Sequence, residues 1–468
     1  MATYYWYVAA NGNGSWTTAA TNWYTGSGGT GSPASVAPGT ADTVIFNAAS
    51  GSGTCTVSNV SIGNIDATGF TGTITGSNTT ISVYGSYVTL SETGIFAVNR
   101  NPVLQIMSGS TTTLTSRGQT VGDIIINNGS TLVLGDSLTV QNNVPITITA
   151  GTINANGKDI VAGSFIDNGS ASTKSIIFGS GRWTFGAGGP PNNPAVTCAL
   201  TGSNTTTNIS GSQPIRLLRY QGISRLKTLG GIDSSTTSIQ LYGALIQNSS
   251  TVTWGTTGTV LIDNEQITYT GLTVTSASND VTLTGCTRGA NETTATSHSQ
   301  YAPVILIYPA PVTQLSSDLL STESTTINAV NAGNIGGANG YLLIDSEAVG
   351  YASKTGTTFV TLTRGSSYGT TGTVTHLSGA TIRSIESRTV NTGSLTMPQF
   401  ECSTNGNYTF TDFSGNGANS AGGINNIIMT NTKMTNAGAQ KITFTSGSDG
   451  TYYSNLYSID EDFLAFFD

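Results

Sequence analysis

Short runs of alternating apolar and polar residues, each ended by a turn-forming residue, constrain this chain more than any other feature. From about Ile62 to Phe185, pairs such as Leu132 and Leu134 alternate with polar residues before a Gly, Asn or Ser interrupts them. Strands this short, with no helix-sized gap between them, favour stacked coils over a sandwich of long strands. The sequence therefore predicts an all-β chain with a β-solenoid at residues 61–228.

Composition supports a packed β protein and argues against several functions. Charged residues make up 9% of the 468 residues, against roughly 25% in an ordinary soluble protein. A hydrophobic content of 37% argues against disorder. The net charge is −8 and the 16 Lys and Arg are scattered singly, so we expect no nucleic-acid partner. No apolar run is long enough to span a bilayer, so we expect no membrane insertion.

Cysteine usage and the N-terminus bear on where the chain is made. The four cysteines are far apart and form no CxxC pair, which favours reduced thiols over a zinc site. The opening "MATYYWYVAA" lacks the basic region and apolar stretch of a secretion signal. We therefore expect synthesis in a cytoplasm without export by that route.

One pattern of acids, Tyr, Arg and His occurs twice. "VLIDNEQITYTG" begins at Val260, and "LLIDSEAVGYAS" begins at Leu342. The matched residues are Asp263, Glu265, Tyr269, Arg288 and His298 in the first repeat, and Asp345, Glu347, Tyr351, Arg364 and His376 in the second. This duplication predicts two small β-barrel or β-sandwich modules, residues 229–310 and 311–387, inserted into the solenoid.

These residues allow a metal-binding or catalytic interpretation and a structural one. Imidazoles and carboxylates are good ligands and bases. Asp263 and Glu265, two apart on an expected strand, would share a face, but His298 falls in a Thr/Ser-rich loop. We therefore expect structural ion pairs or turn caps, with Arg288 and Arg364 as partners, and no metal or cofactor. Asx-rich turns make Ca²⁺ conceivable, but no EF-hand loop or nonapeptide repeat supports it.

The N-terminal segment, residues 1–60, is rich in aromatic residues, including Trp6, Trp16 and Trp23. Such residues could form a platform for sugars, or a cap that covers the open end of the solenoid. We favour the cap.

The C-terminal segment, residues 388–468, returns to strand-like sequence and ends in "SIDEDFLAFFD". Its last apolar residues, after three acids, are Phe463, Leu464, Phe466 and Phe467. This tail either docks into a groove on a partner or closes the last coil.

The first repeat resembles a small β module that is widespread in virion proteins of tailed bacteriophages. The resemblance rests on "LIDNEQITYTG" and "LTGCTRGANETTATSHSQYAPVIL", with Glu292 where the family usually has Gly. The second repeat is more divergent, because Leu362 replaces the Cys equivalent and residues 366–369 fill the turn differently. The opening "NGSWTTAATNW" and "ADTVIF" are also similar to β-helical phage and bacterial-surface proteins.

The resemblance implies a virion structural protein, most simply a tail fibre, spike or similar appendage in assembly and host attachment. Expected partners are further copies of the chain, with a trimer favoured, other virion proteins, and a host surface glycan as a further candidate. Alternatives are a capsid decoration or head-fibre protein, a bacterial surface adhesin, and a polysaccharide-degrading tailspike.

The tailspike alternative depends on a pair of acids. Glycoside hydrolysis needs two carboxyl groups about 5–10 Å apart. Asp159 and Asp167 could lie on neighbouring strands, but each is beside a turn, where Asp is expected anyway. We therefore expect no enzymatic activity.

Overall fold

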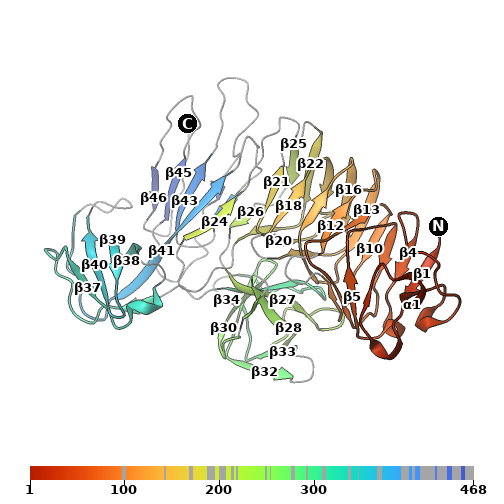
Figure 1. The fold of residues 1–468 in the computed structure, drawn as a ribbon. Helices are drawn as coiled ribbons and strands as arrows, with labels where there is room; N and C mark the ends of the chain where they lie inside the picture. Colours follow the sequence, from red (N-terminus) through yellow and green to blue (C-terminus); the bar gives the residue numbers. More distant parts are fainter. Residues whose placement is uncertain are drawn as a thin grey trace.

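The structure is a computed structural model. It describes residues 1–411 apart from 97–101, 142–143, 168–171, 187–194, 200–206, 212–214, 218–219, 248–249, 253, 276–279, 291–292, 308–311, 336–338, 346, 366–371, 392–399 and 403–405; beyond 411 it describes 427–428, 440–444 and 455–458. The described chain is nearly all β, with a β-solenoid of about 6 turns, as the alternation predicted. Figure 1 shows the solenoid strands stacked from the N-terminal end toward the C-terminal strands.

Three short strands form most coils of the solenoid, one on each of three faces. The first face consists of β3 (Trp23–Tyr24), β1 (Thr3–Trp6), β4 (Thr43–Ile45), β7 (Asn64–Asp66), β10 (Tyr87–Thr89), β13 (Thr111–Thr115), β16 (Ser130–Leu134), β19 (Gly151–Asn154), β22 (Lys174–Gly179) and β25 (Thr207–Gly211). The second face holds two separate sheets in coil order. The first sheet consists of β2 (Gly14–Ser15), β5 (Thr54–Val57), β8 (Thr73–Gly76) and β11 (Ile95–Phe96), and the second of β14 (Thr120–Val121), β17 (Leu138–Val140), β20 (Ile160–Ala162), β23 (Trp183–Phe185), β26 (Ile215–Leu217), β42 (Phe400–Cys402) and β44 (Ile427–Ile428).

The third face consists of β6 (Val60–Ile62), β9 (Thr80–Val83), β12 (Val103–Ile106), β15 (Ile124–Ile126), β18 (Pro145–Ile148) and β21 (Ser164–Asp167), followed in coil order by β24 (Ala195–Ala199), β41 (Thr381–Asn391), β43 (Gly406–Thr411) and β45 (Gln440–Phe444). β46 (Asn455–Ser458) pairs antiparallel with β45. Short helical turns are α1 (Ala19–Asn22), η1 (Ala9–Asn11), η2 (Ser27–Gly29), η3 (Ala48–Ser50) and η4 (Ala332–Asn334). No described helix is long and apolar enough to cross a bilayer.

Alternating side chains on parallel strands build one continuous core inside the coils. In β16, Leu132 and Leu134 point inward and are fully buried, while Val133 between them is partly exposed. Leu132 lies in register between Thr112 on one neighbouring strand and Ile153 on the other, so each coil covers the apolar surface of the last. A single buried cluster extends in this way from Trp6 to Phe185.

The N-terminal aromatic residues form a packed cap. Trp6, Trp16 and Trp23 are buried. Trp23 packs edge-on against Trp6 and Trp16 with ring centroids 5.2 and 5.0 Å apart, and the ring centroid of Phe46 lies within 5.8 Å of all three. Strand β3 pairs antiparallel with β1, which ends the otherwise parallel first face. The three indole rings therefore offer no face to a sugar. Because β1, β2, β4 and β5 already belong to solenoid faces, the solenoid begins before residue 61.

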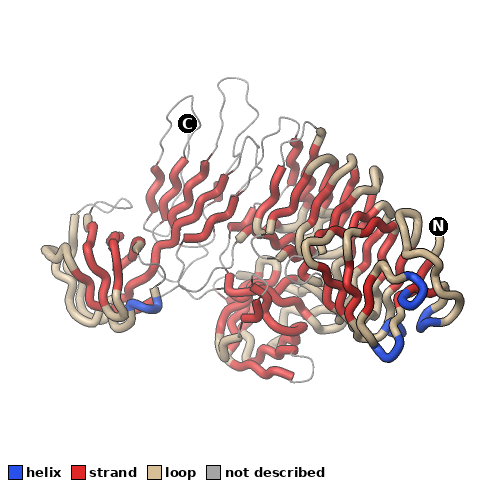
Figure 2. The backbone as a smooth tube through the Cα atoms, in the orientation of Figure 1, coloured by secondary structure: helices blue, strands red, loops and turns tan. Residues whose placement is uncertain are grey.

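The chain leaves the solenoid at one corner and returns at the next strand position. β26 pairs in parallel with β42, although almost 200 residues separate them, and β24 pairs in parallel with β41. The residues between β26 and β41 form two antiparallel sheets, which Figure 2 shows beside the solenoid. Strand β41 joins the two parts, because its first half pairs within the second sheet and its second half pairs with β24 and β43.

Each antiparallel sheet has its own buried cluster and is called here the first or second unit. The first consists of β27 (Tyr220–Leu226), β28 (Ile239–Gln247), β29 (Ser250–Val252), β30 (Gly258–Ile262), β31 (Glu265–Tyr269), β32 (Gly271–Thr275), β33 (Asp280–Thr284), β34 (Thr287–Ala290) and β35 (Pro303–Ile307). The second consists of β36 (Val312–Gln314), β37 (Thr326–Asn328), β38 (Gly340–Ile344), β39 (Glu347–Lys354), β40 (Thr358–Thr363) and the first half of β41. Closure of either sheet into a barrel or sandwich stays a prediction.

The first unit begins earlier than the predicted boundary at residue 229. Strand β27, Tyr220–Leu226, pairs antiparallel with β28 and β35 and so belongs to the unit. The repeated motif could not reveal this strand, because the matched residues begin at the β30–β31 hairpin.

We predict that Trp23→Ala destabilises the first coils by about 3–5 kcal/mol, since it removes a fully buried aromatic ring and leaves a cavity. Native-state hydrogen exchange of β1, β4 and β5 measures this opening free energy. Tyr84→Ala is the control, because this ring is 39% exposed and outside the cap. Equal effects of the two substitutions would contradict the role of the cap.

Candidate functional site

A tight hairpin positions the acids of the first repeat. Ile262 at the end of β30 pairs with Glu265 at the start of β31, so only Asp263 and Asn264 make the turn. Asp263 has φ of 51°, a left-handed conformation that Asp tolerates better than most residues. Asp345 takes the same position in the second repeat, with φ of 49°. Asp263 and Asp345 thus lie in turns, not on the strands that the spacing predicted.

The carboxylate of Glu265 is buried and fully hydrogen-bonded. Arg288 on β34 donates to it with two nitrogens, Nε to Oε1 at 2.7 Å and Nη2 to Oε2 at 2.8 Å. The backbone N–H groups of Gly289 and Thr296 donate at 2.8 and 3.0 Å. Glu265 is only 1% exposed, so these bonds replace the water that the charged group has lost.

His298 joins the two acids of the repeat. Its Nδ1 lies 2.5 Å from Oδ2 of Asp263, and its Nε2 lies 2.8 Å from Oε2 of Glu265. Reciprocal backbone bonds to Ile232, both 2.9 Å, hold the histidine in place. The sequence placed His298 in a Thr/Ser-rich loop and did not group it with the acids, whereas the structure brings the three side chains together.

The second repeat forms the same cluster. Arg364 donates to Glu347 from Nε at 2.8 Å and from Nη2 at 2.6 Å. His376 lies 2.7 Å from Asp345 and 3.0 Å from Glu347, and it pairs through its backbone with Leu319. The structure therefore brings together four of the five matched residues in each repeat, and in each one the arginine pairs with the glutamate.

The electrostatics of the first cluster follow from these contacts. Burial raises the pKa of Glu265, but hydrogen bonds from Arg288, Thr296, Gly289 and His298 outweigh it and bring the pKa to about 2. Burial lowers the pKa of His298, but the hydrogen bond and charge of Asp263, with those of Glu265, raise it above the ordinary value. An imidazolium can donate from both ring nitrogens. With His298 in this form, the charges of His298 and Arg288 balance those of Asp263 and Glu265.

The fifth matched residue, tyrosine, belongs to the core of each unit. Glu265, Ile267 and Tyr269 alternate along β31 and face the same buried side. Burial, with a smaller contribution from Cys286, raises the pKa of Tyr269 to about 12, and its hydroxyl donates to the carbonyl of Gly255 at 3.2 Å. A Cβ at Gly258 would lie 2.8 Å from that hydroxyl oxygen.

This glycine was missed in the sequence, although a signal existed. Gly258 and Gly340 stand at the same distance before Tyr269 and Tyr351, and each glycine pairs with its tyrosine across the hairpin. Tyr351 is likewise buried, which raises its pKa to about 12. Gly-to-Tyr spacing, compared between the repeats, would have identified the pair.

The cluster has little capacity for catalysis or metal binding. Both nitrogens of His298 already face carboxylates, and both oxygens of Glu265 accept several bonds, so no free base faces solvent from these two groups. Across the described ranges, no group of three or more His, Cys, Asp or Glu is arranged to hold a metal ion. Cys55 and Cys286 are buried free thiols.

Comparison with protein-family models, curated proteins and solved structures gives no match.

The first unit packs against the solenoid through apolar and charged contacts. Val161 of β20 forms a small buried cluster with Ile223, Leu261 and Ile305 of the unit. Arg216 of β26, only 6% exposed, donates from Nη1 to the carbonyl oxygen of Asp263 at 2.7 Å and from Nη2 to Oδ1 of Asn264 at 2.6 Å. From the side of the unit, Arg225 of β27 donates to the backbone carbonyls of Arg117 and Glu92 in the solenoid.

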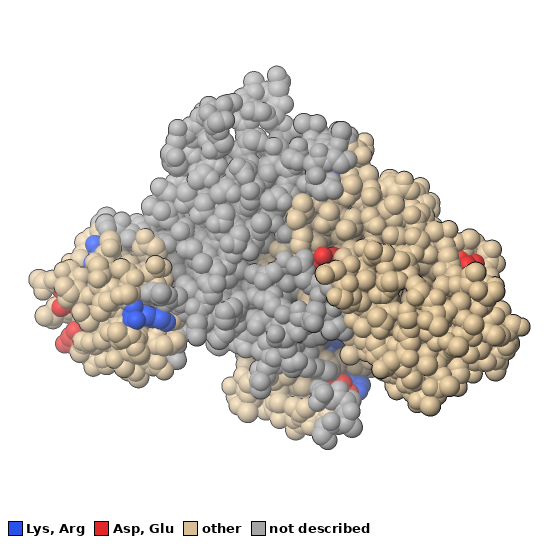
Figure 3. Space-filling view, in the orientation of Figure 1, with Lys and Arg blue, Asp and Glu red and all other residues tan. Residues whose placement is uncertain are grey.

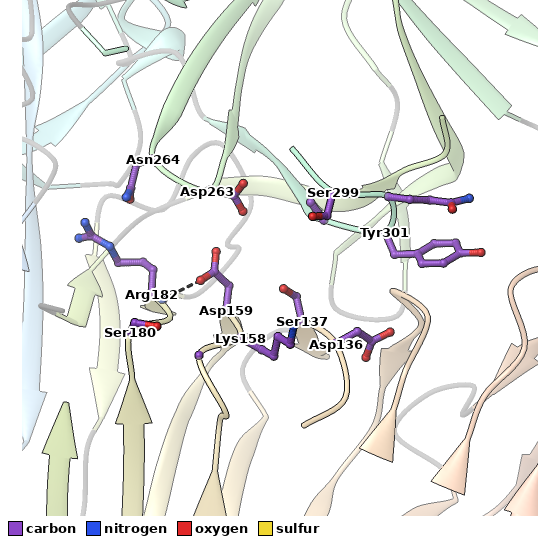
Figure 4. Close-up of a pocket in the computed structure, with 13 residues that line it drawn as sticks. Asp136, Ser137, Lys158, Asp159, Ser180, Arg182, Asp263, Asn264, Ser299 and Tyr301 are labelled. Carbon is purple, nitrogen blue, oxygen red and sulfur yellow. Dashed lines mark hydrogen bonds between the residues drawn. The ribbon is translucent and has the colours of Figure 1, made fainter. Parts of the chain in front are cut away.

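A polar cavity of ≈ 330 Å³ lies at this junction (Figure 4). Three carboxylates, several hydroxyl and amide groups, and two cations surround it: Asp136, Ser137, Gly157, Lys158, Asp159, Ser180, Arg182, Asp263, Asn264, Ser299, Gln300, Tyr301 and Ala302. The three aspartates that line the cavity could not be grouped from the sequence, because they come from solenoid coils and a hairpin that are remote along the chain.

The two acids considered for glycan cleavage do not form a pair on adjacent strands. Asp159 precedes β20 on the second face, and Asp167 ends β21 on the third, whose side chain is outside the described residues. Asp136 and Asp159 do accept bonds from turn backbone, at Ser116, Arg117 and Arg182, as expected for Asp beside a turn.

The apolar tail, from Phe463 to Phe467, is outside the described residues. Its docking to a partner stays a prediction.

We predict that Glu265→Gln costs the first unit about 3–5 kcal/mol, because it leaves buried Arg288 without its counter-charge. Glu347→Gln should cost the second unit a similar amount through Arg364. Urea unfolding of each variant measures these losses. Glu323→Gln is the control, since this side chain is only partly buried and its amide can still accept from Thr325, so it should change little. A negligible effect at Glu265 would refute its structural role.

The stability of the first unit should depend on pH in two ranges. The pKa of Glu265 falls on folding, so its contribution is present above about 4.5 and disappears as pH falls toward 2. The pKa of His298 rises on folding, so its contribution is present below 6.5 and disappears as pH rises through the folded value. Thermal unfolding from pH 2 to 9 measures both limbs. In Glu265→Gln the loss of stability at acid pH should be smaller than in wild type. An unchanged loss would contradict its assignment to Glu265.

Proposed function

We propose that this chain is a structural component of a tailed-phage virion, a fibre, spike or similar surface appendage that acts in assembly and host attachment. The observation that carries the proposal is the repeated cluster of Asp, His, Glu and Arg, whose charges are used within each unit. The motif that resembles a phage virion module therefore serves the fold of that module and not a reaction. The solenoid on which it is carried is compatible with an appendage.

The surface composition agrees with a scaffold. Figure 3 shows only scattered Lys, Arg, Asp and Glu on the described part of the visible face. A solenoid leaves strand edges at its ends, and further copies of the chain can cover them. The proposed partners are thus copies of the chain, in a trimer, together with other virion proteins and a host surface glycan. The proposed location is the virion.

The geometry gives no support to a glycan-cleaving pair at the junction. Asp159 and Asp263 face each other in one cavity, and each already interacts with another group of this chain, Asp159 with the backbone N–H of Arg182 and Asp263 with His298. We therefore propose attachment without cleavage. Incubation of the purified protein with the capsular or O-antigen polysaccharide of the host should release no oligosaccharides, and release that Asp159→Asn abolishes would establish an enzyme instead.

Cryo-electron microscopy of purified virions, with mass spectrometry of the same particles, tests the virion assignment. We expect density that fits the solenoid and both units at a few symmetric positions on the tail. Many copies spread over the capsid would replace the appendage by a decoration protein. Absence of the chain from particles that carry the other structural proteins would overturn the proposal.

A further inference from the structure

Two carboxyl groups face each other where the first unit packs on the solenoid. Asp159 belongs to the coil before β20, and its Oδ1 accepts from the backbone N–H of Arg182 at 2.7 Å. Asp263 belongs to the hairpin of the unit, where His298 holds one of its oxygens. Both side chains line the same cavity, and they point toward each other in Figure 4.

Two ionised carboxylates that face each other in a partly buried site repel. A single proton shared between them turns the repulsion into a hydrogen bond. We propose that Asp159 and Asp263 form a proton-dependent latch between the solenoid and the first unit. The latch is closed when the pair holds a proton and weakened when both carboxylates are charged. The apolar cluster around Val161 and the bonds from Arg216 favour docking at any pH.

The direction of the pH dependence follows from the environment of Asp159. Burial, followed by the negative charge of Asp263, raises the pKa of Asp159 from 3.8 to about 7 in the docked structure. Undocking exposes the group and returns its pKa toward the ordinary value. Docking therefore takes up a proton between pH of about 4 and about 7, and it weakens as pH rises through this range.

Other charged groups surround the pair. Arg216 lies close enough to lower the pKa of Asp159, but its effect is smaller than those of burial and Asp263. Lys158, Arg182 and Asp136 line the same cavity. On the side of the unit, Nδ1 of His298 lies 2.5 Å from Oδ2 of Asp263. The raised pKa is that of Asp159.

The second repeat supplies an internal comparison. Asp345 has the same turn conformation and the same bond to its histidine as Asp263. Its side chain is 61% exposed, against 37% for Asp263, so Asp345 is the more solvent-exposed of the two turn aspartates. The latch is thus a property of the first junction and not of the repeat itself.

Distances between spin labels on the solenoid and on the first unit, measured by double electron–electron resonance, test the proposal in the full chain. Spin-labelled noncanonical residues at Tyr84 on the solenoid and Val274 on the unit are both exposed and leave the cysteines untouched. Wild type should show one narrow distance distribution near pH 4. A second, displaced population should grow as pH rises, by up to about tenfold in the docking ratio per pH unit before it levels off above 7.

Asp159→Asn should stay docked at every pH, because the amide cannot ionise and keeps an oxygen for the N–H of Arg182. Asp345→Asn is the matched control and should follow wild type. Calorimetry is the second readout, and Asp159→Asn should unfold at a higher temperature than wild type at pH 7.5 but not at pH 4. Equal melting temperatures at both pH values, or the same pH response of the distances in Asp159→Asn, would overturn the latch.

Discussion

A buried glutamate directly after the turn of a tight hairpin organises each antiparallel unit. Glu265 and Glu347 start their strands in almost complete burial, which is costly for a charge without partners. A two-pronged arginine, backbone N–H groups and a histidine satisfy these oxygens, and they come from segments that are separate along the chain. The same arginines also donate to backbone carbonyls of a further loop, at Thr236 and Leu320. One ionic cluster therefore fixes a hairpin, a neighbouring strand and two loops.

The solenoid explains how such units can be carried without disturbing the main stack. A coil needs only parallel pairing with the coils before and after it, so a corner can hold a long excursion. β26 and β42 stay adjacent, and β41 continues directly from the second unit into the third face. Because β41 is one uninterrupted strand of both sheets, the second unit is joined to the solenoid through backbone hydrogen bonds as well as through the chain.

The sequence was informative wherever the chemistry was local. Alternation in stretches such as Leu132 to Leu134 predicted the short inward-facing strands, and the repeated order of residues predicted that Arg288 would pair with an acid. Contacts between distant segments were not accessible in this way. His298 reaches Asp263 because a backbone bridge to Ile232 positions its loop, and nothing in its immediate sequence shows that bridge.

The same limit applies to the junction, where Asp159 meets Asp263 only because the first unit docks on the flank of the solenoid.

A double-mutant cycle on Glu265 and Arg288 tests the central claim, that the cluster is a folding element, most directly. The measurement is the free energy of unfolding of Glu265→Leu, Arg288→Met and the double variant. The account predicts that each single substitution leaves a buried charge and costs far more than half of the double, with a coupling above about 1 kcal/mol. Strictly additive losses would show that the two side chains act independently and would contradict it.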